Sequence, residues 1–338
     1  MMKLNNTISL VVLNYNGKEH LKEYFSSVTT QSKKPDAVYL MDNGSTDGSI
    51  AYVKKHFPWV TIISYTKKNL GTAGSSNYAF KKVKTDYVVF QSNDIRLDIH
   101  CIENLHRAIL KLPQAGIVTS VLLQYGKDPH TKKHHIDNAG GIVDRYGFGM
   151  QQYPNQIIDS IPNWGEVFFS YGGSFIISSA LFRKIGGYDD RYFTLNDDID
   201  LSWRARLYGY HIYYTSDSVV YHKVSATLGI RYDRPIKRYW SERNMLRTVL
   251  KNYRIRDFLT RFPVYILLYI AQMIFLLYKK KWRLIGANGK AVLWNIWYFP
   301  DTVTYRRQIK KRISQTVEPY LYPGSLKIKL FSAFQKAF

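Results

Sequence analysis

Residues 7–42 read TISLVVLNYNGKEHLKEYFSSVTTQSKKPDAVYLMD and contain two apolar runs separated by an amphipathic one. The first run, residues 7–14, is short and apolar, which is typical of a buried strand. Residues 17–30 place apolar side chains at helical spacing, and residues 37–42 form a second short apolar run. A strand, a helix and a strand in this order predict a βαβ unit, in which both strands lie parallel in one sheet.

The same alternation continues to about residue 110. Further strands are predicted at residues 60–65 and 87–91, and further helices at residues 47–56, 74–83 and 99–110. These elements predict an α/β fold built on a parallel sheet. In such sheets ligands bind beyond the carboxyl ends of the strands, so the polar residues that follow each strand are candidates for a binding site.

The charge is distributed unevenly along the 338 residues. The whole chain carries a formal charge of +23. Residues 1–222 contain 24 basic and 20 acidic residues, whereas residues 223–338 contain 24 basic and only 5 acidic residues. We therefore expect two regions, a folded α/β domain over residues 1–225 and a basic, aromatic-rich helical region over residues 226–338.

The basic region suits either an anionic membrane surface or nucleic acid. A nucleic-acid-binding protein is expected to carry basic residues throughout its folded domain, yet the first 222 residues are nearly balanced. Residues 262–278 contain no charge and are followed by three lysines, which favours a helix lying in the membrane interface over one that spans the bilayer. The sequence therefore predicts a membrane-associating region and no nucleic-acid partner.

Polar residues follow three of the predicted strands. Asp42 closes the strand 37–42 and offers a carboxylate to a ligand at the strand end, although an Asn-Gly turn explains the same residues. Asn69 and Gly71 begin a helix where backbone N–H groups can approach phosphate or sugar oxygens. Asp94 follows the strand 87–91 and is placed to bind a divalent cation, although a turn aspartate is an equally good interpretation.

An acidic cluster at residues 197–200 opens another predicted helix. Asp197, Asp198 and Asp200 repel one another, so one of them can keep a raised pKa and act as a general base. The alternative is an acidic first helical turn, paired with Arg204 and Arg206. Downstream, His222 ends a strand-like run and is a candidate metal ligand, although a lone histidine is more often structural.

Six motifs in this order resemble those of family 2 glycosyltransferases with the GT-A fold, particularly the branch that includes rhamnosyltransferases of surface polysaccharide assembly. The motifs are VLNYNG at 12–17, DNGSTDG at 42–48, NLG at 69–71, ND at 93–94, GGYDDRYF at 186–193 and DDIDLSWR at 197–204. The resemblance implies a Rossmann-like mixed sheet with helices on both faces. It also implies an inverting transfer of a sugar from a UDP- or dTDP-sugar to a saccharide or lipid-linked saccharide acceptor.

The resemblance also assigns roles to particular residues. The residues that it implies in donor binding are Asn14, Tyr15, Asp42, Lys68, Asn69, Gly71 and Asn93. Asp42 would recognise the pyrimidine. Asp94 would bind Mg²⁺ or Mn²⁺ on the donor diphosphate, and His222 would approach the same metal or the phosphates.

On the acceptor side, Asp198 is implied as the general base, with Asp197 beside it. The residues implied in acceptor binding are Gly172, Gly173, Trp203 and Arg204, of which Trp203 and Arg204 would also support the helix. Two residues depart from the family pattern beside the implied metal ligand and the implied base. Ser92 replaces the usual Asp or Asn two residues before the metal ligand, and Asp197 replaces a Glu.

The same residues bear on two other functions. A sugar nucleotidyltransferase would need a Gly-rich run ending in Arg or Lys after the first strand, which this sequence lacks. A non-catalytic membrane partner is the remaining alternative. With one cysteine, Cys101, the chain needs no oxidising compartment, so we expect a cytoplasmic protein bound peripherally to the inner face of the cell membrane. The sequence is also compatible with a homo-oligomer.

Overall fold

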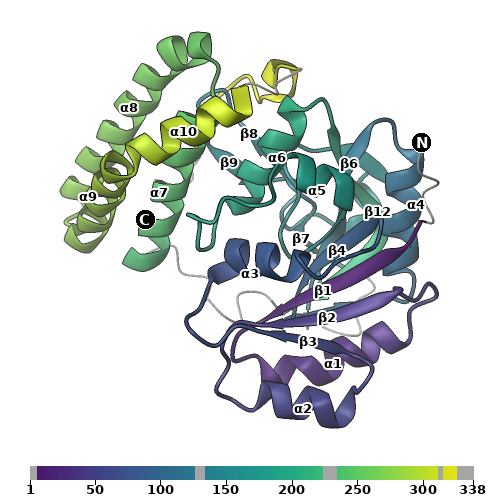
Figure 1. The fold of residues 1–338 in the computed structure, drawn as a ribbon. Coiled ribbons are helices and arrows are strands. Elements are labelled where there is room, and N and C mark those ends of the chain that lie inside the picture. The colour runs from purple at the N-terminus through teal and green to yellow at the C-terminus, as the bar shows by residue number, and fades with distance from the viewer. Residues whose placement is uncertain (1–5, 126–133, 224–233, 311–314, 326–338) are drawn as a thin grey trace.

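A computed structural model describes residues 6–125, 134–223, 234–310 and 315–325 (Figure 1). Its centre is a mixed sheet of ten strands, and a group of C-terminal helices lies beside the sheet. The α/β class predicted from the sequence is confirmed. The sheet is mixed, as the family resemblance implies, because strands from the second half of the domain add to the parallel amino-terminal part.

The amino-terminal half alternates strands and helices as predicted. Its elements are β1 (Ile8–Asn14), α1 (Lys18–Thr29), β2 (Ala37–Asp42), α2 (Ser49–His56), β3 (Thr61–Ser64), α3 (Gly71–Phe80), β4 (Tyr87–Ser92), β5 (Ile95–Leu97) and α4 (Cys101–Lys111). The largest difference is at α3, which begins three residues before the predicted position. Its first turn is rich in small residues and gives no apolar periodicity from which to predict it.

The second half of the domain supplies the remaining strands. Its elements are β6 (Ala115–Gln124), β7 (Ile136–Asn138), β8 (Gly141–Val143), β9 (Gly149–Gln151), η1 (Ile158–Ser160), β10 (Trp164–Glu166), β11 (Ser174–Ser178), α5 (Ser179–Lys184), α6 (Asp197–Leu207) and β12 (His211–His222). β8 and β9 form a separate two-stranded sheet.

The strand order places the carboxyl ends of several strands at one edge. The order is β10-β12-β6-β11-β4-β1-β2-β3, in which β3, β2, β1 and β4 run parallel. β11 is antiparallel to both β4 and β6, and β6 is parallel to β12. Asn14 at the end of β1 aligns with Asp42 at the end of β2. This edge is where such sheets bind their ligands.

Two apolar cores cover the two faces of the sheet. One core contains Leu21, Phe25, Val53 and Leu105, which come from α1, α2 and α4. The other contains Ala79, Phe182, Leu201 and Ala205, which come from α3, α5 and α6. Because α6 packs on the sheet through Leu201 and Ala205, the acidic residues of its first turn lie at the sheet's ligand-binding edge.

The C-terminal region is helical. It contains α7 (Pro235–Asn252), α8 (Ile255–Tyr278), α9 (Trp282–Trp297), α10 (Phe299–Lys310) and η2 (Glu318–Tyr320). A third apolar core joins Trp203 of α6 to Val249 of α7 and Tyr265 of α8. The predicted domain boundary at residue 225 lies outside the described residues.

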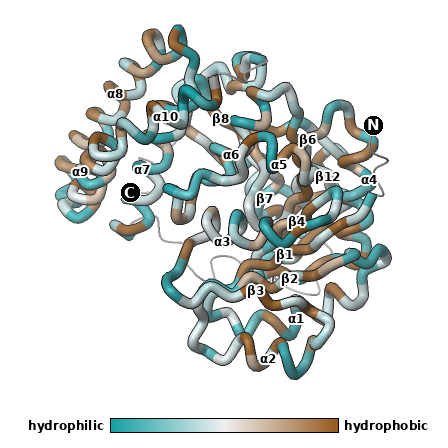
Figure 2. Tube along the Cα trace, in the orientation of Figure 1, coloured by the Kyte–Doolittle hydropathy of each residue, from teal (hydrophilic) through white to brown (hydrophobic). Residues whose placement is uncertain are grey.

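The uncharged segment 262–278 lies within α8. Among the described residues, α8 is the one helix that is long and apolar enough to cross a membrane by length and composition. Its Tyr265, Tyr269 and Leu276 are buried against the protein. Over its most apolar stretch of 18 residues, however, only 22% is buried. Figure 2 shows hydrophobic residues along α8 and α9 as well as along the strands of the sheet.

Candidate functional site

Asn14 joins the ends of three strands. Its side-chain Nδ2 donates to Asp42 Oδ1 at 2.9 Å and to Ser45 Oγ at 3.0 Å, and its Oδ1 accepts from Asn93 Nδ2 at 2.6 Å. Asn14 is 2% exposed, so these hydrogen bonds are shielded from solvent. The structure thus brings together the predicted donor-binding residues that follow β1, β2 and β4.

Asp42 is completely buried, and both of its carboxylate oxygens are bonded within the chain. Oδ1 accepts from Asn14, and Oδ2 accepts from the backbone N–H groups of Gly44 at 3.2 Å and Ser45 at 3.0 Å. A ligand that donates a hydrogen bond to Asp42 must therefore share an oxygen that already has a partner. Tyr15 and Lys68 are exposed, and both are accessible to a ligand.

Gly71 has a packing role that the sequence did not reveal. Its φ is +70°, and a Cβ atom there would lie 1.9 Å from the backbone oxygen of Phe193. The next residue, Thr72, donates its backbone N–H to the same oxygen at 2.7 Å. Asn69 Oδ1 accepts from Gly71 N at 2.8 Å and from Asn43 Nδ2 at 2.5 Å. The start of α3 is therefore fixed against the loop that precedes α6.

Asp94 and His222 face each other, with Asp137 behind the histidine. His222 Nε2 lies 3.6 Å from Asp94 Oδ2, and His222 Nδ1 lies 2.8 Å from Asp137 Oδ2. Burial alone would lower the pKa of His222, but hydrogen bonds to Asp137 and Asp94 outweigh it and raise that pKa to about 9. Asp137 could not be chosen from the sequence, because β7 is too short to show an alternating pattern.

Asp94 retains one oxygen for a ligand. It is 8% exposed, and its Oδ1 is buried with no hydrogen-bond partner. Among the described residues, no three acidic, histidine or cysteine side chains form a complete metal site. Asp94 nevertheless fits a cation that takes its other ligands from a diphosphate and water, which is how Mg²⁺ is commonly held, and His222 can join it where the cation displaces the imidazole proton.

The three aspartates at the start of α6 have three different environments. Asp197 accepts from Thr72 Oγ1 at 2.7 Å. Asp198 is partly exposed, and desolvation together with the negative charge of Asp197 raises its pKa to about 7. Asp200 is fully buried and pairs with Arg204 at 2.9 Å and with Lys251 at 2.8 Å. Only Asp198 combines access with a pKa suited to a general base.

A continuous set of contacts links Asp198 to Asp94. The backbone of Gly172 lies within hydrogen-bonding reach of the Asp198 carboxylate. The adjacent Tyr171 places its ring 6.3 Å from the His222 ring, and His222 contacts Asp94. A Cβ atom at Gly172 would meet nothing within 4 Å, whereas Gly173 is buried against Leu122. Asp198 therefore lies at the edge that holds Asp94, with open space at Gly172.

Trp203 and Arg204 do not face this space. Both are completely buried, so neither can contact an acceptor as the sequence analysis expected. Arg204 Nη1 donates to the backbone oxygens of Ile185 at 2.6 Å and Gly187 at 2.7 Å, and Arg204 Nε donates to Asp200 at 2.9 Å. The two residues lie on the inward side of α6, where they support the helix.

The arrangement of strands and helices is similar to that of solved glycosyltransferases. Mannosyltransferase PcManGT from Pyrobaculum calidifontis, in complex with GDP-Man and Mn²⁺, matches with a TM-score of 0.52 at 17% identity, over 86% of this chain and 87% of that chain. GalNAc-T7 with UDP, GalNAc and Mn²⁺ gives a TM-score of 0.56 at 16% identity, over 72% of this chain and 48% of that chain. The fold is that of the GT-A glycosyltransferases.

The chain belongs to glycosyl transferase family 2, whose profile matches residues 9–186. It is 23% identical over 244 residues to an N-acetylglucosaminyl-diphospho-decaprenol L-rhamnosyltransferase of Mycobacterium tuberculosis strain CDC 1551 / Oshkosh, covering 66% of this chain and 78% of that protein. It is 23% identical over 276 residues to the poly-beta-1,6-N-acetyl-D-glucosamine synthase of Staphylococcus aureus strain COL, covering 78% and 60%. The protein is therefore a glycosyltransferase that uses a nucleotide-activated sugar, and the predicted resemblance is confirmed.

Proposed function

We propose that this protein is an inverting glycosyltransferase that moves a sugar from a UDP- or dTDP-sugar to a saccharide or lipid-linked saccharide acceptor in surface polysaccharide synthesis. The observation that carries the proposal is that Asp198, on the acceptor side, is connected to Asp94, on the donor side, through Gly172, Tyr171 and His222. A carboxylate with a pKa of about 7 beside open space is suited to removing a proton from a sugar hydroxyl.

The donor would lie across the carboxyl ends of β1, β2 and β4. Tyr15 and Lys68 are exposed there, and Asn14 and Asn93 hold the loop ends at a fixed separation. Asp94 and His222 would hold Mg²⁺ or Mn²⁺, which supplies positive charge to the leaving diphosphate. The buried, unpartnered Oδ1 of Asp94 supports this assignment.

The chemistry at the acceptor is a single displacement. Asp198 accepts the proton of the attacking hydroxyl as the oxygen bonds to the anomeric carbon, and the bond to the diphosphate breaks on the opposite face. The sugar configuration is inverted, and no covalent enzyme intermediate forms. Asp197 assists because its charge keeps the pKa of Asp198 raised, so Asp198 is basic enough to take the proton.

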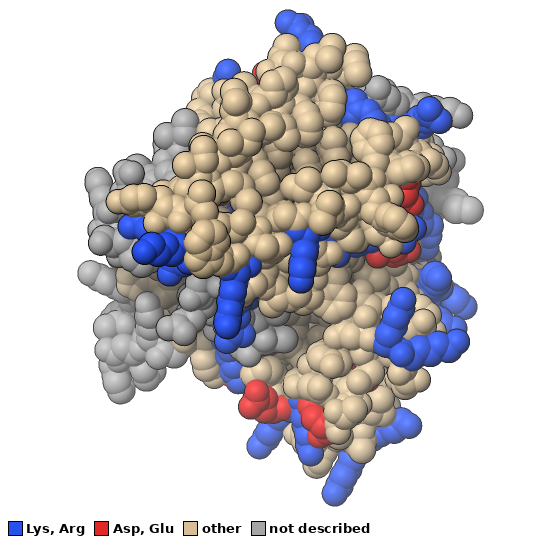
Figure 3. Space-filling view, turned by 90° about the vertical axis from the view of Figure 1, so that its left-hand side faces the viewer, with Lys and Arg blue, Asp and Glu red and all other residues tan. Residues whose placement is uncertain are grey.

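A membrane-bound acceptor is supported by the surface of α8 and α9. Exposed apolar residues recur along one side of both helices, namely Leu259, Ile266, Leu267, Ile270, Ile274, Leu277, Trp282, Leu293, Ile296 and Trp297. Figure 3 shows a broad area without charged side chains on this side of the molecule, bordered by Lys and Arg. Such a face suits the surface of an anionic bilayer.

The same helices favour a position in the plane of the membrane. Gln272, in the middle of the uncharged segment of α8, donates to Glu242 of α7 at 3.2 Å. α7 also carries Arg243, Arg247 and Lys251, so it cannot enter hydrocarbon with its partner helix. These contacts support a helix pair that lies in the membrane plane, and we propose that the protein binds the cytoplasmic face, beside the head group of a polyprenyl diphosphate saccharide.

The direct test is a panel of UDP-, dTDP- and GDP-sugars with Mn²⁺ or Mg²⁺ and a polyprenyl diphosphate saccharide as acceptor. Donor-dependent release of the nucleotide and a glycosylated product are expected from the wild type. Asp198→Asn should abolish transfer and leave nucleotide affinity nearly unchanged, because the residue contacts the acceptor rather than the donor. Turnover by Asp198→Asn at the wild-type rate would overturn the mechanism.

A further inference from the structure

The turn that leads into α6 has an unfavourable backbone. Leu195 has a φ of 68°, and Asn196, the residue before α6, has a φ of 59°. Asparagine adopts this left-handed conformation readily, whereas a leucine there is strained by its Cβ atom. Asp197 and Asp198 follow at once, so the direction in which the Asp198 carboxylate points depends on this turn. Contacts from elsewhere must therefore hold the turn in place.

Helix α7 supplies these contacts. Asn244 Nδ2 donates to the backbone oxygens of Thr194 at 2.8 Å and Leu195 at 2.7 Å. In return, Asn196 Nδ2 donates to the backbone oxygen of Ser241 at 2.9 Å. Asn244 is completely buried, so water cannot replace its side chain in these bonds. The side-chain amide of Asn244 thus connects α7 to the carbonyl groups of Thr194 and Leu195.

The opposite side of the turn is held by α3. The backbone oxygen of Phe193 accepts from Thr72 N at 2.7 Å, and Gly71 makes this close approach possible. The segment 193–196 is therefore held between α3, which belongs to the donor side of the site, and α7. The residues that hold this turn lie more than 40 positions before it and more than 40 positions after it in the sequence.

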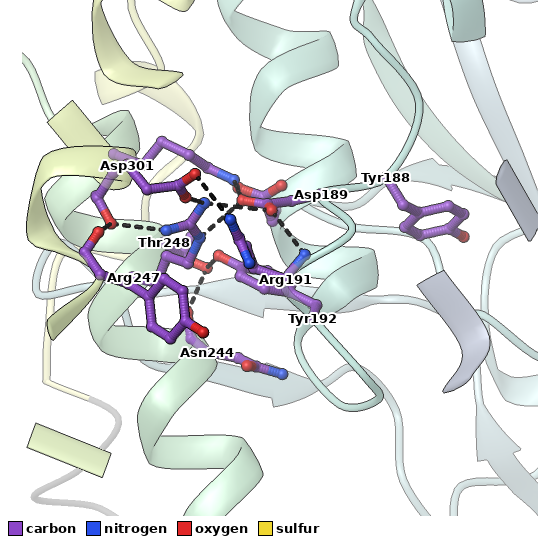
Figure 4. Close-up of polar contacts among 12 residues, drawn as sticks. Tyr188, Asp189, Arg191, Tyr192, Asn244, Arg247, Thr248 and Asp301 are labelled. Carbon is purple, nitrogen blue, oxygen red and sulfur yellow. Dashed lines mark hydrogen bonds and ion pairs between the residues drawn. The ribbon is translucent and has the colours of Figure 1, made fainter. Parts of the chain in front are cut away.

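Helix α7 is itself fixed relative to α6. Lys251 pairs with Asp200 of α6 at 2.8 Å, and Thr248 Oγ1 lies 2.8 Å from Tyr192 Oη. Asn244, Thr248 and Lys251 are spaced by four and three residues, so they lie on one side of α7. Figure 4 shows Asn244, Arg247 and Thr248 along α7, beside Asp189 and Tyr192 of the loop that precedes α6.

We propose that Asn244 is a positioning residue for the general base, holding Leu195 in its left-handed conformation so that Asp198 faces the acceptor. The inference rests on the proposed role of Asp198 and extends it to a residue that touches neither substrate. Without the amide, the Leu195 turn relaxes and the carboxylate moves away from the attacking hydroxyl. Small displacements of a reacting group lower the rate strongly, so the effect is expected in kcat.

The test compares Asn244→Ala with Asn288→Ala. Asn288 is also a completely buried asparagine of the C-terminal helices, but it bonds to Arg238 and Met273 rather than to the turn. We expect kcat to fall about 10- to 100-fold in Asn244→Ala, with the KM for the donor and the Kd for the free nucleotide nearly unchanged. Asn288→Ala should retain kcat. Equal kcat values in the two variants would overturn the proposal.

A second substitution tests the cause. Glycine adopts a φ of 68° without strain, so Leu195→Gly in the Asn244→Ala background should restore much of the lost kcat. In the Asn288→Ala background the same substitution should leave kcat unchanged, which separates the rescue from a general gain in stability. Absence of rescue would overturn the proposed role of the strained turn.

Amide hydrogen exchange tests the role of Asn244 without requiring that the protein be an active glycosyltransferase. Were the wild type inactive with every donor, the proposed function would fail, yet the turn could still be examined. Residues 195–199 should exchange faster in Asn244→Ala than in Asn288→Ala, because their backbone loses its fixed conformation. Unchanged exchange in this segment would overturn the inference whatever the activity.

Discussion

Lys251 of α7 and Asp200 of α6 form an ion pair at 2.8 Å in which neither side chain reaches solvent. The same ammonium group lies 2.6 Å from Asp189 Oδ2, which also accepts from Arg247 Nε at 2.8 Å. A buried lysine thus joins the loop before α6, the helix α6 itself and the first helix of the C-terminal region. Removing one partner from such a group leaves an uncompensated charge in the interior.

The first prediction concerns this lysine. In Lys251→Met, Asp189 and Asp200 lose a shared cation but keep Arg247 and Arg204, so we expect the free energy of unfolding to fall by about 3 kcal/mol. Urea unfolding followed by circular dichroism measures the change. Lys54→Met, at an exposed position of α2, is the control and should differ little from the wild type. Equal losses in the two variants would contradict the prediction.

The second prediction is the dependence of stability on pH. Burial alone would raise the pKa of Asp189, but Lys251 and Arg247 outweigh it and hold that pKa well below its usual range. The pKa of Asp200 is also lowered, since Arg204 and Lys251 outweigh its burial. A lowered pKa in the folded state stabilises the protein above the unfolded pKa of about 4, and the gain is lost as the pH falls below it.

The free energy of unfolding should therefore drop as the pH is lowered from about 5 to 3. In Lys251→Met the drop should be shallower, because the pKa values of the two aspartates move back toward the ordinary range. A parallel pH dependence in both proteins would argue against the ion pairs as its source.

The roles of the acidic residues show how far the sequence could predict this site. The motif at 197–204 contains Asp198, the proposed general base, and parallel strands necessarily bring Asn14, Asp42 and Asp94 to one edge. The resemblance singled out Asp198, but it could not show that Asp200 is buried and paired with Lys251, which is distant in sequence. Similarly, Asp137 becomes visible as the partner of His222 only after β7 is placed beside β6.

The other differences between the predicted and the observed roles of residues are explained by burial. A tryptophan and an arginine after an acidic cluster are compatible with a sugar-binding surface or with an interior support, and periodicity cannot distinguish these when the helix is buried all round. All residues of α6 from Ile199 to Leu207 are buried, so the acceptor role assigned to Trp203 and Arg204 was wrong while the supporting role matches their contacts. The position of Asn244 against Leu195 likewise depends on long-range packing.

The third prediction is a pH dependence of the rate. Desolvation and the charge of Asp197 raise the pKa of Asp198 to about 7, and the base must be unprotonated to act. We expect kcat to rise with pH through about 7. Asp197→Asn removes the neighbouring charge, so the acid limb of the profile should move to lower pH. The surface variant Asp217→Asn should not move it, and an equal shift in both would contradict the assignment.

The fourth prediction concerns the metal. Asp94→Asn should reduce by at least about tenfold the tightening of nucleotide binding by Mn²⁺, because a neutral amide is a poor ligand for a hard cation. Isothermal titration with Mn²⁺ and with EDTA gives the two affinities for each protein. With EDTA the wild type and the variant should bind alike, and Asp98→Asn should retain the full effect of Mn²⁺. Undiminished tightening in Asp94→Asn would exclude it as a ligand.

The fifth prediction concerns the membrane. Trp297 is 81% exposed on α9 and Leu267 is 65% exposed on α8, the two helices that carry the exposed apolar residues. Placing a glutamate at either position puts a negative charge against an anionic bilayer and removes apolar area from it, so both terms of the binding free energy become less favourable. We expect Leu267→Glu and Trp297→Glu each to reduce sedimentation with anionic vesicles at physiological salt.

The matched control is Trp164→Glu, since Trp164 is an exposed tryptophan on β10, outside the α8–α9 face. It removes the same side chain and adds the same charge, so it changes the net charge and the solubility equally. If Trp164→Glu lowers vesicle binding as much as Trp297→Glu, the attraction is a general effect of the positive charge. If only the substitutions on α8 and α9 lower it, the bilayer contacts this face, and transfer to a lipid-linked acceptor should fall in the same variants while transfer to a soluble saccharide persists.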